Sequence, residues 1–355
     1  MHEHLPLLLN KGNILLRELG HLLRHVTRFA DLGLFWFRYR AGIFLGKSVD
    51  NGHAPPLSSR ELPPRKRNLS QTGHKALCRD NIFMITGPAR TGSTLLVHLL
   101  RSHPQICSHS EVFSPTNITG LTGTYLEKSR NEPDFFERLS AERDRDPIKF
   151  LYKIALDSQG KEVVGFKLKH DELVLPEYGR LRDEIAGDPD FRIIHLRREN
   201  LLRRFLSWYI ANHITHLTLA VGPQNIPQVP PVRLDPDECQ RDFETTLKRE
   251  KEFQELFATH KSFSITYEEL AAGNNDKIFA LLHFLQVTPR KLTTTTKRLG
   301  NDDLRAAIAN FDELRLHFAS TQFAHFFEET GSEGTDCQTN SRAPDRSVLN
   351  VHGAC

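Results

Sequence analysis

The segment of residues 81–96 constrains the fold of this chain more than any other. An apolar, strand-like run breaks at Gly87, and a second glycine, Gly92, stands just before an apolar helix start at Leu95. A strand, a glycine-rich turn and a helix in this order form a phosphate-cradling loop, because backbone N–H groups converge on the anion and the helix N-terminus adds partial positive charge. The segment therefore predicts an α/β fold with an anion site at this loop.

The loop meets the nucleotide-binding pattern G-x-x-x-x-G-K-S/T only in part. Gly87, Gly92 and Thr94 fit the pattern, but Ser93 occupies the position of its lysine. The nearest cation is Arg90, which lies earlier in the loop. The loop can therefore hold a phosphate-like group, yet it lacks the lysine that reaches the β- and γ-phosphates of a nucleoside triphosphate.

Four apolar runs are predicted to be buried strands, at residues 82–86, 163–168, 191–196 and 263–266. Helical patterns accompany them at residues 95–100, 150–156, 201–211 and 243–257. Short buried strands separated by helices predict a parallel sheet built from βαβ units. Ligands of such sheets bind at the carboxyl ends of the strands, where Lys167, Lys169 and the pair Arg197 and Arg198 also fall. The predicted fold is a P-loop-type α/β fold, with a parallel sheet flanked by helices.

The loop resembles that of the sulfotransferases that use 3′-phosphoadenosine 5′-phosphosulfate (PAPS), in particular the bacterial type. Their loop typically reads P-K/R-S/T-G-S/T-S/T, and this chain matches it with one extra residue after Pro88. The resemblance covers about residues 80–328. It implies that the 5′-phosphosulfate is held by Arg90, Thr91, Gly92, Ser93 and Thr94.

The resemblance extends to the strand end near residue 197. Sulfotransferases hold the 3′-phosphate with an arginine at a strand end and a serine on the next helix. Ser207 follows Arg198 by nine residues and Arg197 by ten, which is slightly more than the usual spacing. We choose Arg198, and the register stays open. A guanidinium suits this role because it donates bidentate, charge-assisted hydrogen bonds to phosphate.

Three further cations are candidate cofactor ligands. Lys167 lies inside an apolar strand, and a buried lysine needs an anionic partner, which is either the cofactor or a neighbouring carboxylate. Bacterial sulfotransferases carry a late basic loop over the cofactor, and Lys297 and Arg298 resemble it. The resemblance implies that both bind the 3′-phosphate, and an exposed basic loop is the alternative.

The segment after the loop helix supplies the candidate general base. Residues 102–113 resemble a segment of bacterial sulfotransferases whose glutamate is proposed as the base in some members. An acceptor hydroxyl loses its proton as it attacks sulfur, and a carboxylate placed beside it can accept that proton. Glu111 is the first choice and His109 the second. The alternative is that Glu111 pairs with a loop arginine such as Arg90 and is purely structural.

Composition bounds the remaining functions. The 355 residues carry a net charge of only +3, which does not predict nucleic-acid binding. The five cysteines include no C-x-x-C pair, so neither a disulfide framework nor a zinc site is indicated, and no metal is expected. A reducing compartment is the simplest interpretation. We find no apolar stretch long enough for a transmembrane helix and no signal peptide, and we therefore expect a cytoplasmic protein.

The flanking regions differ from the predicted sulfotransferase domain at residues 79–330. Residues 1–47 are expected to form an amphipathic helical extension, in which residues 12–47 pack on the domain or on a second subunit, or lie on a membrane surface. Packing is favoured. Residues 48–78 are predicted to be a basic linker rich in proline and serine, and residues 331–355 a disordered polar tail.

These features predict an enzyme that transfers the sulfuryl group of PAPS to an acceptor hydroxyl without a metal. The acceptor is a small molecule or a glycan, and a carbohydrate or glycolipid hydroxyl is suggested by family analogy alone. The oligomeric state is not predicted. Two alternatives are kept: a P-loop kinase-like phosphotransferase, and a non-catalytic module that binds a nucleotide. Ser93 at the lysine position and the basic strand end at Arg197 argue against the kinase.

Overall fold

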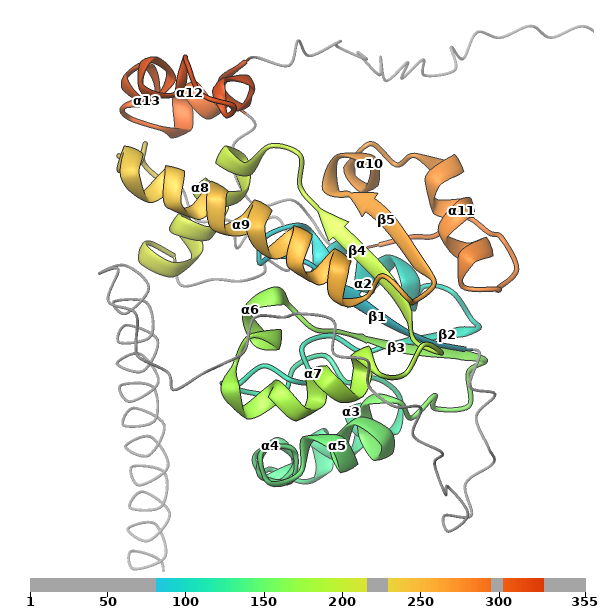
Figure 1. Ribbon diagram of the computed structural model, residues 1–355. Helices are drawn as coiled ribbons and strands as arrows, with labels where there is room; N and C mark the ends of the chain where they lie inside the picture. The colour runs from blue at the N-terminus through green and yellow to red at the C-terminus, as the bar shows by residue number, and fades with distance from the viewer. Residues whose placement is uncertain (1–80, 216–228, 295–302, 329–355) are drawn as a thin grey trace, which may run out of the picture.

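The computed structural model describes residues 81–215, 229–294 and 303–328 (Figure 1). Its centre is a five-stranded sheet in the order β2-β3-β1-β4-β5, in which every neighbouring pair is parallel. The strands are β1 (Ile82–Thr86), β2 (Ile106–Ser108), β3 (Val163–Lys167), β4 (Arg192–Arg197) and β5 (Ser262–Thr266). The predicted α/β fold with a parallel sheet is therefore confirmed.

The carboxyl ends of the strands define the edge at which the candidate residues gather. β1 lies in the middle, with β3 on one side and β4 on the other. In this register Ile85 pairs with Lys167, and Thr86 pairs with His195. The strand that sequence analysis missed, β2, has only three residues. It matters because it leads directly into the segment that carries Glu111.

Helices cover both faces of the sheet, and a further group of helices lies past the carboxyl end of β4 (Figure 1). The first half of the chain contributes α2 (Ser93–Arg101), α3 (Thr124–Asn131), α4 (Phe135–Arg145), α5 (Pro147–Phe150), η2 (Leu151–Ala155), α6 (His170–Leu173), η3 (Pro176–Tyr178) and α7 (Gly179–Ala186). The second half contributes α8 (Leu201–His213), α9 (Pro236–Leu256), α10 (Tyr267–Ala271), α11 (Asn275–Phe284), α12 (Leu304–Ala307), α13 (Phe311–Phe318) and η5 (Ala324–Phe327).

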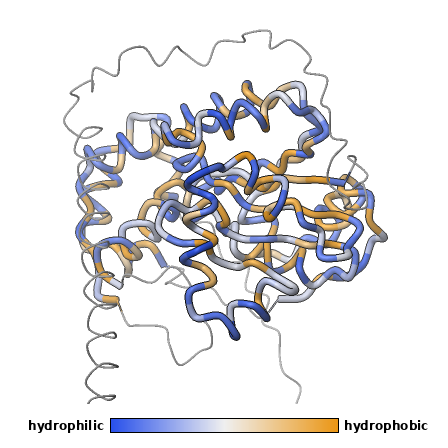
Figure 2. Tube along the Cα trace, turned by 90° about the horizontal axis from the view of Figure 1, so that it is seen from below, coloured by the Kyte–Doolittle hydropathy of each residue, from blue (hydrophilic) through white to orange (hydrophobic). Residues whose placement is uncertain are grey.

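Successive side chains of β1 point alternately into two hydrophobic cores. Met84 faces a core shared with α4, α5, α7 and the end of α9, whereas Phe83 and Ile85 face a core shared with α2 and α11. Successive side chains of a strand point to opposite faces, so a strand that is apolar throughout must be covered on both sides. Figure 2 shows hydrophobic stretches running through the interior and alternation along the outer helices. A third core, rich in phenylalanine, joins α8, α9, α12 and α13.

Two predicted helices have different bounds in the structure. The pattern at residues 150–156 falls on the end of α5 and on η2, a π-helix. The pattern at residues 243–257 is the second part of α9, which begins at Pro236 after an Asp235 cap. Asp235 accepts a hydrogen bond from the Glu238 backbone N–H, which supplies the helix start that the apolar periodicity alone could not reveal.

Several expectations concern residues outside the described ranges. The helical extension at 1–47, the linker at 48–78, the tail at 331–355 and the basic pair Lys297 and Arg298 all fall there. No helix within the described ranges is long and apolar enough to cross a membrane. Of the five cysteines, Cys107 and Cys239 are described, and both are buried free thiols.

Candidate active site

Two glycines give the phosphate-type loop its shape. A Cβ atom on Gly87 would lie 2.2 Å from the Leu196 carbonyl oxygen of β4, so only glycine lets the loop leave the sheet this close to its neighbour. Gly92 has a φ of +81°, and a Cβ atom there would lie 2.5 Å from the Tyr267 ring. Both positions therefore require glycine, one for close approach and one for backbone conformation as well.

The loop leads into the N-terminus of α2 and leaves its first amide groups available. Gly92 occupies the cap position, and no side chain caps the helix. The first N–H groups of a helix have no partner within the helix, so they can bind an anion. Thr91 Oγ1 donates to the Pro88 carbonyl at 2.9 Å, a bond that closes the loop on itself.

Arg90 points from the loop to the helix that follows β4. Its backbone has a positive φ of 69°, a conformation uncommon for a residue with a side chain. Its Nε donates to Ser207 Oγ of α8 at 3.0 Å, although the two residues are 117 positions apart. Burial lowers the pKa of Arg90 below its usual value, and the opposing effect of the Glu111 charge is smaller. The structure thus brings together two residues that were assigned separately to the 5′- and 3′-ends of the cofactor.

The geometry also separates the two arginines at the end of β4. Arg198 Nη1 donates to the Arg90 carbonyl oxygen at 3.3 Å, and its guanidinium lies 4.5 Å from the centre of the Tyr267 ring. Arg197 is the last residue of β4 and is exposed. Arg198 is therefore held against the loop by two contacts. This favours Arg198 for the 3′-phosphate.

Glu111 lies within an ion-pair cluster and remains partly open to solvent. Its Oε1 is 2.7 Å from Lys167 Nζ and its Oε2 is 3.1 Å from Lys169 Nζ. Burial alone would raise the pKa of Glu111, but the charges and hydrogen bonds of the two lysines outweigh burial and lower it to about 2. The side chain keeps 27% of its surface exposed. The partner that Lys167 needs is thus a carboxylate in this structure, and the ion pairs of Glu111 are with these lysines rather than with Arg90.

The segment that carries Glu111 is tied to its surroundings by its backbone. The His109 N–H donates to the Gly165 carbonyl at 2.8 Å, and the Lys167 N–H donates to the Ser110 carbonyl at 3.3 Å. Arg101, at the end of α2, donates to the Ser108 carbonyl at 2.7 Å. The Glu111 carboxylate is therefore positioned by β3 and α2 together.

His109, the second candidate base, occupies a different environment. Its side chain is fully buried, and its ring contacts Cys107 Sγ at 3.5 Å and the Asp157 carbonyl at 3.3 Å. Burial lowers the pKa of His109 to about 4, although the hydrogen bond with Asp157 acts in the opposite direction. An imidazole without exposed surface cannot meet an acceptor in this conformation. The geometry favours Glu111, and the catalytic roles of both residues stay predictions.

Sequence analysis gave no role to three residues that shape the site. Tyr267 fills the space beside Gly92 and stacks on Arg198. Lys169 was noticed at a strand end, and its pairing with Glu111 depends on the β2–β3 register. Arg204 of α8 is buried and donates to the Ala89 carbonyl of the loop at 3.2 Å. The sequence signal for Arg204 was its spacing: it lies three residues before Ser207, so both side chains fall on the same side of α8.

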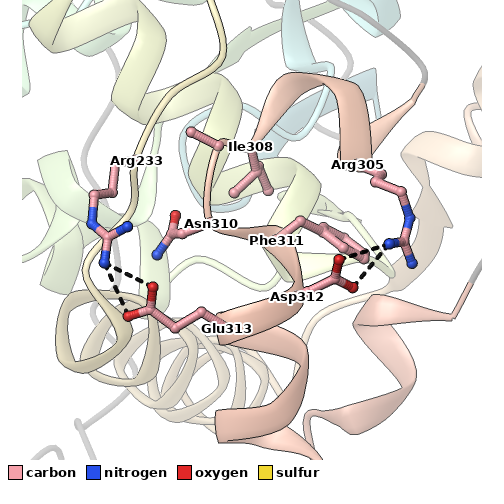
Figure 3. Close-up of a pocket in the computed structure, with 8 residues that line it drawn as sticks. Arg233, Arg305, Ile308, Asn310, Phe311, Asp312 and Glu313 are labelled. Atoms are coloured by element: carbon pink, nitrogen blue, oxygen red, sulfur yellow. Dashed lines mark hydrogen bonds and ion pairs between the residues drawn. The ribbon is translucent and has the colours of Figure 1, made fainter.

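A concave region elsewhere has a different character. It encloses about 330 Å³ beside α12 and α13, and its lining is Arg233, Arg305, Ile308, Ala309, Asn310, Phe311, Asp312 and Glu313 (Figure 3). Arg233 pairs with Glu313 at 2.7 Å, and Arg305 pairs with Asp312 at 2.9 Å. Each positive charge is thus matched by a carboxylate, which makes this region a poor anion site. Among the described residues, no group of three or more His, Cys, Asp or Glu side chains could hold a metal ion.

Comparisons with known proteins point to one family. The model of the sulfotransferase family matches residues 82–290, which is more than half of the chain. Nodulation protein H from Rhizobium tropici is 29% identical over 249 residues, which are 69% of this chain and 92% of that protein. Nodulation protein H from Rhizobium meliloti strain 1021 is 27% identical over 248 residues, which are 69% of this chain and 94% of that protein.

Solved structures with some likeness carry sulfotransferase titles as well. The sulfotransferase from Alicyclobacillus acidocaldarius is 22% identical, with a TM-score of 0.39, and the match covers 67% of this chain and 90% of that one. The likeness in structure is too low to carry an argument, so the assignment rests on the family match. This chain belongs to the sulfotransferase family and is an enzyme of sulfuryl transfer.

Proposed function

We propose that this enzyme transfers the sulfuryl group of PAPS to an acceptor hydroxyl at the carboxyl edge of the sheet. The observation that carries the proposal is the 3.0 Å hydrogen bond between Arg90 Nε and Ser207 Oγ. It joins the anion loop after β1 to the helix after β4, and Arg198 lies against the same loop. One nucleotide with phosphates at both its 3′- and 5′-ends would use both groups of donors.

The residues present fit this co-substrate. The uncapped N-terminus of α2, with the Ser93 and Thr94 hydroxyls and the Arg90 guanidinium, offers donors to the 5′-phosphosulfate. Arg198 and Ser207 offer a guanidinium and a hydroxyl to the 3′-phosphate. Charge-assisted hydrogen bonds of this kind contribute about 1.5–3 kcal/mol each. Lys297 and Arg298, which lie outside the described residues, are proposed as further ligands of the 3′-phosphate.

Glu111 is proposed as the general base. The acceptor oxygen forms a bond to sulfur, its proton passes to the Glu111 carboxylate, and the bond from sulfur to the 5′-phosphate oxygen breaks. That oxygen keeps the electron pair, and 3′,5′-bisphosphoadenosine leaves. Arg90 and the backbone N–H groups of the loop stabilise the charge that develops on the bridging oxygen.

The low pKa of Glu111 describes the protein without an anion at the loop. A carboxylate with a pKa of about 2 is a weak base. The phosphosulfate brings negative charge close to Glu111 and its lysine partners, and like charge raises the pKa of a carboxylate. Binding of the co-substrate therefore makes Glu111 a stronger base at the stage when the proton is transferred.

The acceptor is proposed to be a small molecule or glycan that carries a hydroxyl group. A carbohydrate or glycolipid hydroxyl remains an analogy with the family. We place the reaction in the cytoplasm because the buried thiols of Cys107 and Cys239 are unpaired, which suits a reducing compartment. Contact of residues 12–47 with a membrane surface is kept as the alternative to internal packing.

Turnover with a labelled co-substrate tests the proposal. The full chain is incubated with PAPS carrying a labelled sulfuryl group, a panel of hydroxyl acceptors and a metal chelator, and products are detected by mass spectrometry. We expect the label on an acceptor and formation of 3′,5′-bisphosphoadenosine. A thermal shift caused by ATP with magnesium, in a protein that 3′,5′-bisphosphoadenosine leaves unshifted, would contradict the proposal.

A further inference from the structure

Glu172 is a buried carboxylate of α6 that neither the family resemblance nor the proposed reaction uses. Only 2% of its side-chain surface is exposed, and its Oε1 is 3.1 Å from Lys169 Nζ. Its Oε2 accepts a hydrogen bond from the Lys169 backbone N–H at 2.8 Å, so it contacts both ends of the same residue. This arrangement fixes the lysine side chain, because its backbone and its ammonium group are held by one carboxylate.

Lys169 in turn holds the candidate base. Its Nζ lies 3.1 Å from Glu111 Oε2 and 3.1 Å from Glu172 Oε1. Burial would lower the pKa of Lys169, but Glu172 and Glu111 outweigh burial and raise it. The ammonium group is therefore a stable cation between two carboxylates. Lys167, which bonds the other oxygen of Glu111, completes a row of four alternating charges.

The row is balanced, and this balance depends on Glu172. Burial raises the pKa of Glu172, and the charge of Lys169 acts against this. With all four groups ionised, two lysines and two glutamates carry no net charge. Without Glu172, two lysines would converge on the single carboxylate of Glu111. Their charges already outweigh burial in lowering the pKa of Glu111. An unshared second lysine would lower this pKa further and weaken the base.

We propose that Glu172 is a positioning residue for sulfuryl transfer: it holds Lys169 so that this lysine orients Glu111 without fully neutralising it. Glu172 itself touches neither co-substrate nor acceptor in this proposal. The inference rests on the proposed role of Glu111 as the base. It adds a residue that acts through Lys169 and that the loop motif does not contain.

Glu172→Gln tests the inference, because the amide keeps the shape and removes the charge. We expect kcat to fall about 5–20-fold, which is less than the ~10²–10⁴-fold expected when a general base is lost. Affinity for 3′,5′-bisphosphoadenosine, measured by calorimetry, should stay the same or increase, since a negative charge near an anion site has been removed. A merely structural residue would lower kcat, affinity and melting temperature together, and that result would overturn the inference.

A matched control separates capping from positioning. Glu269 of α10 makes a similar capping contact on a more exposed side chain: its Oε2 accepts from the Thr266 N–H at 2.8 Å, and its Oε1 pairs with Lys277 at 3.1 Å. Its partner Lys277 pairs with no Glu111 oxygen among the described residues, unlike Lys169. Glu269→Gln is expected to leave kcat within about twofold of wild type, because a lost cap costs stability rather than turnover. Equal losses of kcat in both variants would overturn the inference.

The background of Glu111→Gln distinguishes failure of this inference from failure of the proposed reaction. If Glu172 acts through Glu111, adding Glu172→Gln to Glu111→Gln should lower kcat by less than about twofold. A normal kcat in Glu111→Gln alone would refute the base, and with it the proposed mechanism. A strong loss in Glu111→Gln with a normal kcat in Glu172→Gln would refute only the positioning role.

A second variant keeps the test available should Glu172→Gln not fold. Lys169→Met with Glu172→Met removes one charge of each sign and leaves no unpaired buried charge, an exchange that cores often tolerate. Glu111 is then held by Lys167 alone. We expect a lower kcat, and an acidic limb of kcat/KM that moves to higher pH, because one of the two cations that lower the pKa of Glu111 is gone. A wild-type kcat would overturn the inference.

Discussion

Glu111 and Glu250 are two largely buried carboxylates with opposite surroundings. Glu111 follows β2 and meets two lysines, so its pKa falls to about 2 in spite of burial. Glu250 lies on α9, and its buried Oε1 has no hydrogen-bond partner among the described residues. Burial raises the pKa of Glu250 to about 7, although Arg197 and Arg204 act against this. The comparison teaches that two close lysines outweigh burial at Glu111, whereas more distant cations leave burial dominant at Glu250.

The neighbours of the two carboxylates extend the contrast. Around Glu111, four charged side chains form the row, and each has an opposite charge within about 3 Å: Lys167, Glu111, Lys169 and Glu172. Beside α9, His170 stacks on Phe253 with ring centres 4.6 Å apart, and both of its ring nitrogens lack hydrogen-bond partners within the described ranges. Burial lowers the pKa of His170 to about 3, so the ring is neutral near pH 7. One region is a row of alternating charges, and the other contains a neutral imidazole and a carboxyl group whose pKa is close to neutral pH.

The largest expected effect is on turnover at Glu111. Glu111→Gln keeps the shape and removes the base, so kcat should fall by about 10²–10⁴-fold. Affinity for 3′,5′-bisphosphoadenosine should stay the same or increase, because the ligands of the nucleotide are on other elements and a negative charge near the anion site is removed. Steady-state kinetics and calorimetry on one preparation check both. Near wild-type turnover in this variant, together with an inactive His109→Ala, would show that the histidine is the base.

A smaller effect, on stability, is expected at Glu250. The folded-state pKa of about 7 lies above the ordinary 4.5, so the stabilising effect of the protonated form is present below pH 4.5 and is lost as the pH rises through 7. Glu250→Gln should therefore be more stable than wild type at pH 8 by about 3 kcal/mol and nearly equal at pH 4.5. Urea unfolding at the two pH values measures this difference.

Turnover supplies the matching control for this variant. Glu250→Gln should leave kcat at neutral pH near the wild-type value, since Glu250 has no part in the proposed reaction. A difference in stability that does not depend on pH would remove the contrast between the two carboxylates. So would a loss of turnover comparable with that of Glu111→Gln.

The smallest expected effect is the loss of stability when an exposed ion pair is removed, and this loss is a reference for the buried ion pairs. Arg233 and Glu313 are both exposed and lie 2.7 Å apart (Figure 3). Water and salt screen such pairs, so Arg233→Ala should cost less than about 1 kcal/mol of unfolding free energy. Chemical denaturation of this variant beside Glu172→Gln checks the scale. If Arg233→Ala lost as much unfolding free energy as Glu172→Gln, burial would not strengthen the ion pairs of the charged row.

The sequence predicted the sheet better than it predicted the site. The strand at residues 82–86, the glycine pair and the basic end of β4 are local signals, and local signals can be read from one chain. The three-residue β2 is too short to produce a periodic pattern. The pairing of Glu111 with Lys167 and Lys169 follows from the register of β2 against β3, which no pattern in the chain expresses.

The same difference between local signals and tertiary contacts explains why the sequence could not assign roles to Arg197, Arg198 and Glu172. Spacing alone could not choose between Arg197 and Arg198, and the contact that sets Arg198 apart is with Tyr267, the first residue of α10. Glu172 looks like an ordinary acidic residue near the start of a short helix. Its importance comes from Lys169, whose side chain turns toward a carboxylate 58 residues earlier in the chain. Contacts across the sheet edge are tertiary, and they appear only in the folded structure.

One titration tests the central claim that a single nucleotide with phosphates at its 3′- and 5′-ends fills this sheet edge. The full-length protein is titrated by calorimetry, without magnesium, with 3′,5′-bisphosphoadenosine and with adenosine 5′-phosphate. Two charge-assisted bonds to the 3′-phosphate, at about 1.5–3 kcal/mol each, predict at least ~100-fold tighter binding of the bisphosphate. Ser207→Ala should remove part of this difference and Arg198→Ala most of it. Equal affinity for the two nucleotides in the wild-type protein would contradict the claim.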